Sequence, residues 1–192
     1  LNYMIINSDN NAAIYLASSL TDNEIKNVFS SVGLDSPVYS TEYPVTTRSY
    51  AGFFRVLYNS SYLTKDYSEK ALEILTKTDF REGLRKYIPS NILIANKFGI
   101  REDQNLKQLH DCGIVYYPKH PYLICVMTKG DNFPNLSSVI SNISKFVFDK
   151  VDAIMPEEKI DWHQSGINAM NYNNELGITA WLDPAAGDIT DE

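Results

Sequence analysis

The sequence has few of the residues and patterns that mark membrane spans, metal sites or cofactor sites. No apolar run comes near the roughly 18 residues that a membrane-spanning helix requires, so we expect no membrane span. There are 2 cysteines and 3 histidines, and the patterns CxxC, HExxH, GxxxxGKS and GxxxxGKT do not occur. We therefore expect no metal and no cofactor. With 17 basic and 24 acidic residues, the formal net charge is −7. No basic cluster stands out, which argues against nucleic acid or an anionic membrane surface as a partner.

The acidic charge is concentrated at the C-terminal end. From Ile160 onward the chain has six acidic residues and neither Lys nor Arg. We predict two parts, a domain over residues 1–155 and an acidic tail over residues 156–192, whose role the sequence leaves open. The tail holds three large side chains, Trp162, His163 and Trp181. These side chains either pack on the domain or belong to a segment that binds a partner.

The start of the chain is unusual for a natural N-terminus. It begins with Leu1 rather than methionine and enters an apolar stretch at residues 3–6 almost at once, whereas natural ends are usually polar and frayed. We interpret the sequence as a fragment or a processed product, in which the true N-terminus and any targeting signal are missing.

Residues 1–90 are predicted to form a helical lobe. The clearest start signal is Thr21 followed three residues later by Glu24, which is a capping box, and Gly33 marks the end of that helix. The predicted helices run over residues 11–20, 21–32, 48–58 and 66–76.

Residues 91–155 are predicted to form a sheet and a C-terminal helix. The predicted strands run over residues 92–98, 113–117 and 122–128, and the predicted helix runs over residues 135–151. A helix that follows an antiparallel meander most simply packs on its face. We therefore predict an α+β fold, a helical lobe beside an antiparallel sheet with the C-terminal helix packed on it.

The two cysteines, Cys112 and Cys125, fall on adjacent predicted strands. If Tyr117 pairs with Tyr122, Ile114 lies opposite Cys125, and Cys112 points to the same face two positions away. The two sulfur atoms are then diagonal neighbours, which favours two buried free thiols. A shift of the hairpin register changes this geometry, so a disulfide stays open as the alternative.

Two short segments carry the candidate chemistry. Ser8-Asp9-Asn10 opens the first predicted helix, and by itself it is typical of an N-cap. Lys97-Phe98-Gly99 ends a predicted strand, and by itself it is typical of a solvated lysine before a turn glycine. Together and in this order, the two segments resemble the S-D-N and K-T-G signatures of the penicillin-recognising serine hydrolases, which are the class A β-lactamases and their D,D-peptidase relatives. The resemblance spans roughly residues 1–155.

This resemblance implies a β-lactamase/transpeptidase-like fold whose N-terminal elements are absent, with the active site between the sheet and the helical lobe. It implies that Ser8 relays a proton to the departing nitrogen, and that Lys97 supplies positive charge near Ser8 and the substrate carboxylate. It also implies that the Asn10 amide holds the side-chain carbonyl of the substrate. Gly99 would let the strand approach the substrate closely.

The sequence departs from the family pattern in its catalytic signatures. No serine is followed three residues later by lysine; Ser141 and Lys145, for example, are spaced by four. Family order places the S-x-x-K nucleophile upstream of Ser8, so we expect this chain by itself to lack an acylation nucleophile. The β-lactamases also carry an E-x-x-L-N whose glutamate activates the deacylating water. The corresponding loop, about residues 35–45, holds only Glu42 and lacks that pattern.

Two further positions differ from the usual family residues. Phe98 stands where the family has Thr or Ser, which removes a hydroxyl that grips the substrate carboxylate and puts a ring in or beside the site. Strand alternation alone allows either face, and the family's use of this position implies a ring that points into the pocket. His110 lies where some relatives have a basic residue that faces the substrate carboxylate; by itself it reads as an exposed loop histidine. Asp111 either orients that ring or is a turn residue.

The function that the resemblance implies is a β-lactamase-like serine hydrolase that acts on β-lactams through an acyl-enzyme. One alternative is a D,D-peptidase that acts on peptidoglycan stem peptides, and another is a non-catalytic binding module derived from this fold. The expected ligand is accordingly a β-lactam or a D-alanyl peptide. We also expect a homo-oligomer or a complementing chain, because a missing core helix leaves apolar faces uncovered. The resemblance implies an extracytoplasmic location: periplasmic, secreted or in the cell envelope.

Overall fold

The structure of the chain is a computed structural model. It describes three stretches of the sequence, residues 1–33, 45–103 and 106–155. By its contacts the chain divides into two units, Leu1–Pro156 and Glu157–Glu192. The tail predicted over residues 156–192, with its two tryptophans, lies outside the described residues.

Five helices precede the sheet in the described residues. They are α1 (Asn2–Ile6), α2 (Asn10–Ala17), α3 (Asp22–Ser31), α4 (Thr47–Tyr58) and α5 (Lys65–Thr76). The capping box predicted for Thr21 and Glu24 is confirmed, because each side chain accepts a hydrogen bond from the backbone N–H of the other. The helix predicted over residues 11–20 is shorter and ends at Ala17, three residues before the predicted end.

Three antiparallel strands form the sheet, in the spatial order β1-β2-β3. They are β1 (Ile94–Asp103), β2 (Leu106–Val115) and β3 (Tyr122–Gly130). The first two strands extend beyond the predicted residues into a hairpin that the sequence analysis missed, in which Asp103 pairs with Leu106. The sequence does not reveal this extension because Arg101 and Glu102 are exposed, so no alternation of apolar residues marks this end of the strand.

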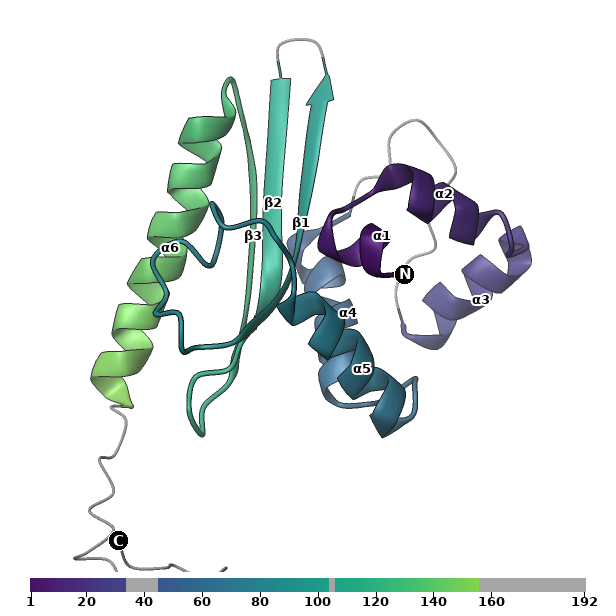
Figure 1. Ribbon diagram of the computed structural model, residues 1–192, viewed down its shortest axis with the longest axis horizontal. Helices are drawn as coiled ribbons and strands as arrows, with labels where there is room; N and C mark the ends of the chain where they lie inside the picture. Colours follow the sequence, from purple (N-terminus) through teal and green to yellow (C-terminus); the bar gives the residue numbers. More distant parts are fainter. Residues whose placement is uncertain (34–44, 104–105, 156–192) are drawn as a thin grey trace, which may run out of the picture. The chain divides into compact units, whose positions relative to one another are not determined.

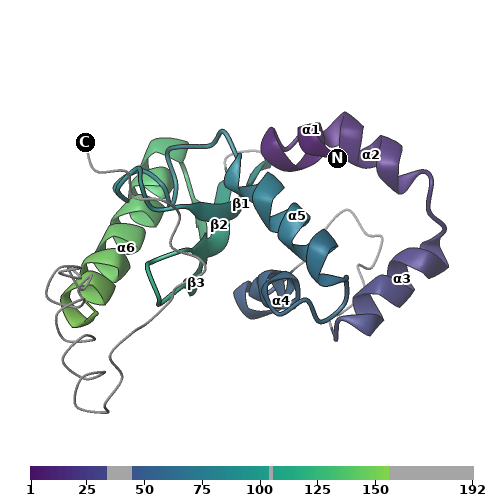
Figure 2. The same cartoon turned by 60° about the horizontal axis from the view of Figure 1, so that its bottom comes forward.

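The sheet has helices on both faces, as Figures 1 and 2 show. The long helix α6 (Phe133–Ile154) covers one face, and α4 and α5 pack against the other. The apolar residues on the α6 side include Leu84, Ile94, Leu109, Leu136 and Ile140. Those on the other side include Phe54, Leu72, Leu75, Ala95 and Ile114. The predicted α+β fold and the packing of the C-terminal helix on the sheet are confirmed.

The two cysteines form a disulfide between β2 and β3. Cys112 lies directly opposite Cys125, and Val115 pairs with Tyr122. The pairing of Tyr117 with Tyr122 was therefore wrong by two residues, and so was the preference for free thiols. A shift of two residues keeps every side chain on its face but turns diagonal neighbours into direct partners. The register depends on where the hairpin connection begins, and the pattern of apolar residues does not fix that point.

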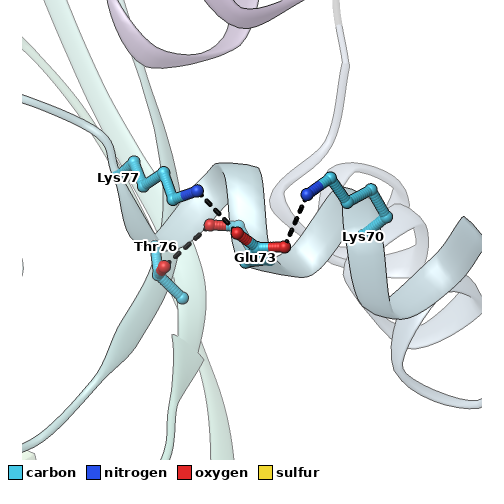
Figure 3. A network of polar contacts seen from close by, with 4 residues as sticks. All are labelled: Lys70, Glu73, Thr76 and Lys77. Atoms are coloured by element: carbon cyan, nitrogen blue, oxygen red, sulfur yellow. Dashed lines mark hydrogen bonds and ion pairs between the residues drawn. The ribbon is translucent and has the colours of Figure 1, made fainter. Parts of the chain in front are cut away.

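A network of exposed side chains surrounds Glu73 near the end of α5 (Figure 3). The Glu73 carboxylate accepts hydrogen bonds from Lys70 at 2.8 Å and from Lys77 at 2.6 Å, and these contacts lower its pKa to about 2. Thr76 donates to the Glu73 carbonyl at 2.7 Å. Exposed ion pairs contribute little to stability. These contacts lie at the C-terminal end of α5.

The first three helices bury very little. None of α1, α2 and α3 contains a buried residue. Large apolar side chains in and beside them are exposed, among them Leu1, Tyr3, Ile14, Tyr15, Leu20 and Val28. These helices therefore contribute little core of their own. Among the described residues, no helix has both the length and the apolar character needed to cross a membrane.

Candidate active site

Ser8 lies in the turn between α1 and α2 and has a strained backbone. Its φ of +56° falls in the left-handed region. Such a conformation costs a non-glycine residue on the order of 1–3 kcal/mol and persists only where the surrounding structure holds it. The next residue, Asp9, caps α2 by accepting a hydrogen bond from the Ala12 N–H at 2.7 Å. The capping role that the segment predicts by itself is thus confirmed for Asp9, and Ser8 makes a different contact.

Lys97 reaches Ser8 from β1. Its ammonium donates to the Ser8 hydroxyl oxygen at 2.6 Å and to the Phe98 carbonyl at 2.7 Å. The two residues are 89 positions apart in the sequence. The structure therefore brings together the two side chains whose meeting the order of the motifs predicts.

Burial weakens the hold of Lys97 on its proton. Desolvation lowers the pKa of Lys97 to about 8, and the carboxylates of Asp111 and Asp79 act in the opposite direction. At neutral pH Lys97 is therefore mostly an ammonium, but it gives up its proton far more readily than an exposed lysine. Such a group both attracts an anion and donates a hydrogen bond to a neighbouring hydroxyl.

The Phe98 ring contacts both Phe80 and the Lys97 ammonium. Alternation along β1 turns Phe98 to the face opposite Lys97. There its ring stacks on Phe80, with ring centroids 4.6 Å apart and planes inclined by 24°. The Lys97 ammonium curls over this ring at 4.5 Å from its centroid, which is a cation–π contact. The ring thus contacts the same ammonium that binds Ser8, and its inward orientation and its contact with substrate stay predictions.

Gly99 and His110 pair across β1 and β2 on the same face as Lys97. A Cβ placed on Gly99 meets nothing within 4 Å, so the described neighbours leave open space there. His110 is half-buried within a strand, which corrects its interpretation as an exposed loop residue. Burial lowers its pKa, so the imidazole is mostly neutral at pH 7. Its Nε2 lies 3.3 Å from the Gln108 amide oxygen, and its Nδ1 has no hydrogen-bond partner among the described residues.

Asp111 does not orient His110 and is not a turn residue, because neighbouring strand residues point to opposite faces. Its carboxylate is fully buried, accepting hydrogen bonds from the Asn96 amide at 2.8 Å and the Leu84 N–H at 2.9 Å. Burial raises the pKa of Asp111 to about 6 against these contacts. The Arg85 guanidinium donates to the side-chain amide oxygen of Asn96 at 2.8 Å. Arg85, Asn96 and Asp111 thus form a buried polar network, and Asn96 directly precedes Lys97 in the sequence.

The sequence analysis missed one contact of the Ser8 turn. The Asn7 amide, one residue before Ser8, donates to the Asp79 carboxylate at 2.7 Å. No pattern in the sequence links these residues, which are 72 positions apart. Asn7 directly precedes Ser8 in the sequence, which could have singled it out, but Asp79 follows α5 well before β1 and carries no such signal.

The remaining predicted residues are only partly placed. Asn10 is the first residue of α2, and its side chain is exposed two positions after Ser8. Glu42 and most of its loop lie outside the described residues, so the prediction of a missing E-x-x-L-N stays a statement about sequence. Within residues 1–33, 45–103 and 106–155, no three His, Cys, Asp or Glu side chains are grouped so that they could hold a metal ion.

Comparison with solved structures finds the same fold in β-lactamases. A β-lactamase from Chitinophaga pinensis superposes with a TM-score of 0.70 and 20% identity, over 78% of this chain and 63% of the other. A class A β-lactamase from Bacteroides cellulosilyticus gives 0.70 and 20%, over 79% and 62%. A PBP-A variant, solved as an acyl-enzyme complex with penicillin G, gives 0.68 and 22%, over 79% and 60%. The chain thus spans less than two thirds of the length of these relatives.

A comparison with curated proteins finds no match. A family model described as the beta-lactamase enzyme family matches residues 1–151. The matched part contains the Ser8 turn, the strand that carries Lys97, and nearly all of α6. Because this match covers most of the sequence, the chain belongs to the beta-lactamase enzyme family.

Proposed function

We propose that the chain forms the proton-relay and ligand-binding part of a serine hydrolase that is acylated by β-lactams. The observation that carries this proposal is the 2.6 Å hydrogen bond from the Lys97 ammonium to the Ser8 hydroxyl. Family membership and the PBP-A acyl-enzyme among the relatives of the same fold support the substrate class.

The chemistry follows from the direction of this hydrogen bond. Acylation forms a bond between a serine oxygen and the lactam carbonyl carbon, and the C–N bond of the lactam breaks. The departing nitrogen must receive a proton. Because Lys97 donates to the Ser8 oxygen, the Ser8 hydrogen is left to point at that nitrogen. The proton that the attacking serine loses returns to Ser8, either directly or by way of Lys97, so that protons and charge balance.

The neighbouring residues supply the binding contacts of the proposal. The positive charge of Lys97 attracts the substrate carboxylate. The open space beside Gly99 lets a ligand lie along the edge strand β1. Asn10 presents an exposed amide to a substrate carbonyl, and His110 lies on the same sheet face as Lys97. Phe98 contributes the cation–π contact that holds Lys97, and a second role for its ring at the substrate is part of the proposal.

The proposed site lacks a candidate nucleophile, because no S-x-x-K occurs in these 192 residues. We place the acylated serine in protein outside them, so the 192-residue chain alone neither forms an acyl-enzyme nor turns over β-lactams. The missing E-x-x-L-N predicts slow deacylation even where a nucleophile is present. Slow deacylation also fits the D,D-peptidase alternative, and the missing S-x-x-K fits a non-catalytic binding module.

We propose an extracytoplasmic location for the protein. The Cys112–Cys125 disulfide supports it, because structural disulfides persist in oxidising compartments such as the periplasm. The location of a bacterial cell-wall or β-lactam hydrolase would be the same, so this observation does not separate the substrate alternatives.

The test is covalent labelling with a fluorescent penicillin, followed by denaturing electrophoresis. The 192-residue chain should carry no label, and the longest encoded protein that contains it should be labelled and should lose the label slowly. In that longer protein, Ser8→Ala and Lys97→Ala should reduce the labelling rate, and Ser138→Ala, on exposed α6 surface, should leave it unchanged. Labelling of the 192-residue chain would show that a serine within it is the nucleophile. A longer protein that carries S-x-x-K but binds no penicillin would contradict the proposed substrate class.

A further inference from the structure

Asp79 lies on a segment that is fixed against the strand carrying Lys97. The helix α5 ends at Thr76, and two residues later the fully buried Thr78 hydroxyl makes two backbone contacts. One is with the Leu75 carbonyl at 3.0 Å, and the other is with the Asn96 carbonyl at 2.7 Å. Because Asn96 immediately precedes Lys97, the position of Asp79 is set relative to Lys97 by a buried contact.

From this fixed position Asp79 holds the Ser8 turn. Its carboxylate accepts the hydrogen bond from Asn7 at 2.7 Å. Asn7 ends α1, a helix of 5 residues with no buried side chain, and such a short helix has little stability of its own. The strained φ of Ser8 therefore needs support from outside the turn, since such conformations persist only where the surroundings hold them.

The Asp79 carboxylate also acts on Lys97 through its charge. Burial lowers the pKa of Lys97, and the negative charges of Asp111 and Asp79 favour its protonated form. Asp111 is fully buried and pairs with Phe98 across β1 and β2, so its side chain lies on the sheet face opposite to that of Lys97. Asp79 is exposed, and its carboxylate accepts the hydrogen bond from Asn7. The Asp79 carboxylate thus contacts Asn7, which precedes Ser8, and its charge also acts on Lys97, the hydrogen-bond partner of Ser8.

We propose that Asp79 is a positioning residue that ties the Ser8 turn to the Lys97 strand and keeps the two side chains in register. It acts through its hydrogen bond with Asn7 and through its charge. The catalytic meaning of this role rests on the proposed function, but the tie itself is a property of the folded chain. It is therefore measured without any substrate.

The experiment uses NMR on the 192-residue chain and three variants that separate the two effects. Asp79→Asn keeps a hydrogen-bond acceptor for Asn7 but removes the charge, and Asn7→Ala removes the hydrogen bond but keeps the charge. Glu69→Gln is the control, because it removes one exposed acidic charge of α5 that is paired with Lys65 at 3.7 Å. The readouts are the pKa of the Lys97 ammonium and the hydrogen exchange of the Asp9 amide, which donates to the Tyr3 carbonyl at 3.2 Å across the turn.

The proposal predicts a different result for each variant. Asp79→Asn should lower the pKa of Lys97, since an opposite charge nearby is removed. Asn7→Ala should speed exchange of the Asp9 amide several-fold and should change the pKa of Lys97 less. Glu69→Gln should change neither. An unchanged Lys97 pKa in Asp79→Asn together with unchanged Asp9 exchange in Asn7→Ala would overturn the proposal. Neither readout depends on hydrolysis, so a failure here is distinct from a failure of the proposed activity.

Discussion

Lys97 donates a 2.6 Å hydrogen bond to Ser8 across 89 residues of sequence, from the edge strand of the sheet to a strained turn of the helical lobe. In the sequence, Ser8 precedes a helix cap and Lys97 lies in a strand, and each pattern is common by itself. Their contact is what turns two common local patterns into a site that can move a proton and attract an anion.

Anion binding at this site should depend on pH through Lys97. Burial lowers the pKa of Lys97 to about 8, so the ammonium is present at pH 6.5 to 7 and is lost as the pH rises through about 8. We expect the affinity of the 192-residue chain for a β-lactam carboxylate to fall over that range. Calorimetric titration at several pH values measures this, with Lys97→Arg as the variant that keeps its charge. An affinity that falls equally in Lys97→Arg would assign the pH dependence to another group.

The same shift affects stability with a defined sign. The folded-state pKa of Lys97 lies below its ordinary value of 10.5, so the unfolded chain binds more protons between about pH 8 and 10.5. Lys97 therefore contributes a free energy of unfolding that rises with pH across that window. Urea unfolding of the wild-type chain and of Lys97→Met should show a difference in stability that changes over this range and is constant below about pH 7.

Asp111 should matter for stability more than its neighbour His110. Asp111→Ala leaves the Leu84 N–H and the Asn96 amide without their buried acceptor, and each unpaired group costs about 1–3 kcal/mol. We expect a loss of about 2–5 kcal/mol in urea unfolding, and a smaller loss for Asp111→Asn, which keeps one acceptor oxygen. His110→Ala, which removes a half-buried ring with one contact of 3.3 Å, should cost less than either. Equal losses for Asp111→Ala and His110→Ala would show that the buried network is not a main support of the strand.

Two glycines give a matched pair of tests. A Cβ on Gly83 would collide with the Asp111 carboxylate and with Phe80, whereas a Cβ on Gly99 meets nothing within 4 Å. Gly83→Ala should therefore destabilise the chain by about 1–3 kcal/mol, as overpacking does, and Gly99→Ala should leave thermal stability nearly unchanged. If the open space beside Gly99 receives a ligand, Gly99→Ala should weaken β-lactam binding although it leaves the fold intact. A stable Gly83→Ala variant would contradict the close packing over Asp111.

The exposed apolar residues of the first three helices predict self-association. The helices α1, α2 and α3 contain no buried residue, and large apolar side chains such as Ile14 and Tyr15 are 67% and 78% exposed. We expect the 192-residue chain to form a dimer or a larger oligomer that covers this surface, as measured by light scattering over a range of concentrations. A monomer with a sharp, cooperative thermal transition and no binding of a hydrophobic dye would contradict this expectation.

Much of the fold can be predicted from the sequence because its signals are local. The capping box at Thr21 and the spacing of apolar residues in α6 each place a helix within a few residues, and the apolar runs indicate three strands without fixing their ends. The order of the two motifs adds the Ser8–Lys97 contact. The exposed half of the β1–β2 hairpin was missed, because its charged residues carry no alternation.

The errors in the site come from features that sequence patterns do not encode. The disulfide depends on a two-residue difference in register, which leaves the apolar pattern unchanged. The stacking of Phe98 on Phe80 involves a residue that lies outside both motifs. The contact between Asn7 and Asp79 is a long-range pair of polar side chains with no periodicity to reveal it.

The central claim is that Ser8 and Lys97 form one β-lactam-binding site, and NMR titration of the 192-residue chain with benzylpenicillin tests it most directly. The signals of Lys97 and of the Ser8 turn should shift together along one binding curve, while those of exposed α6 residues such as Ser138 stay unchanged. Lys97→Ala should weaken binding by about tenfold or more, which corresponds to about 1.4 kcal/mol. Absence of any saturable shift at Lys97 and Ser8, or equal affinity in Lys97→Ala, would contradict the account.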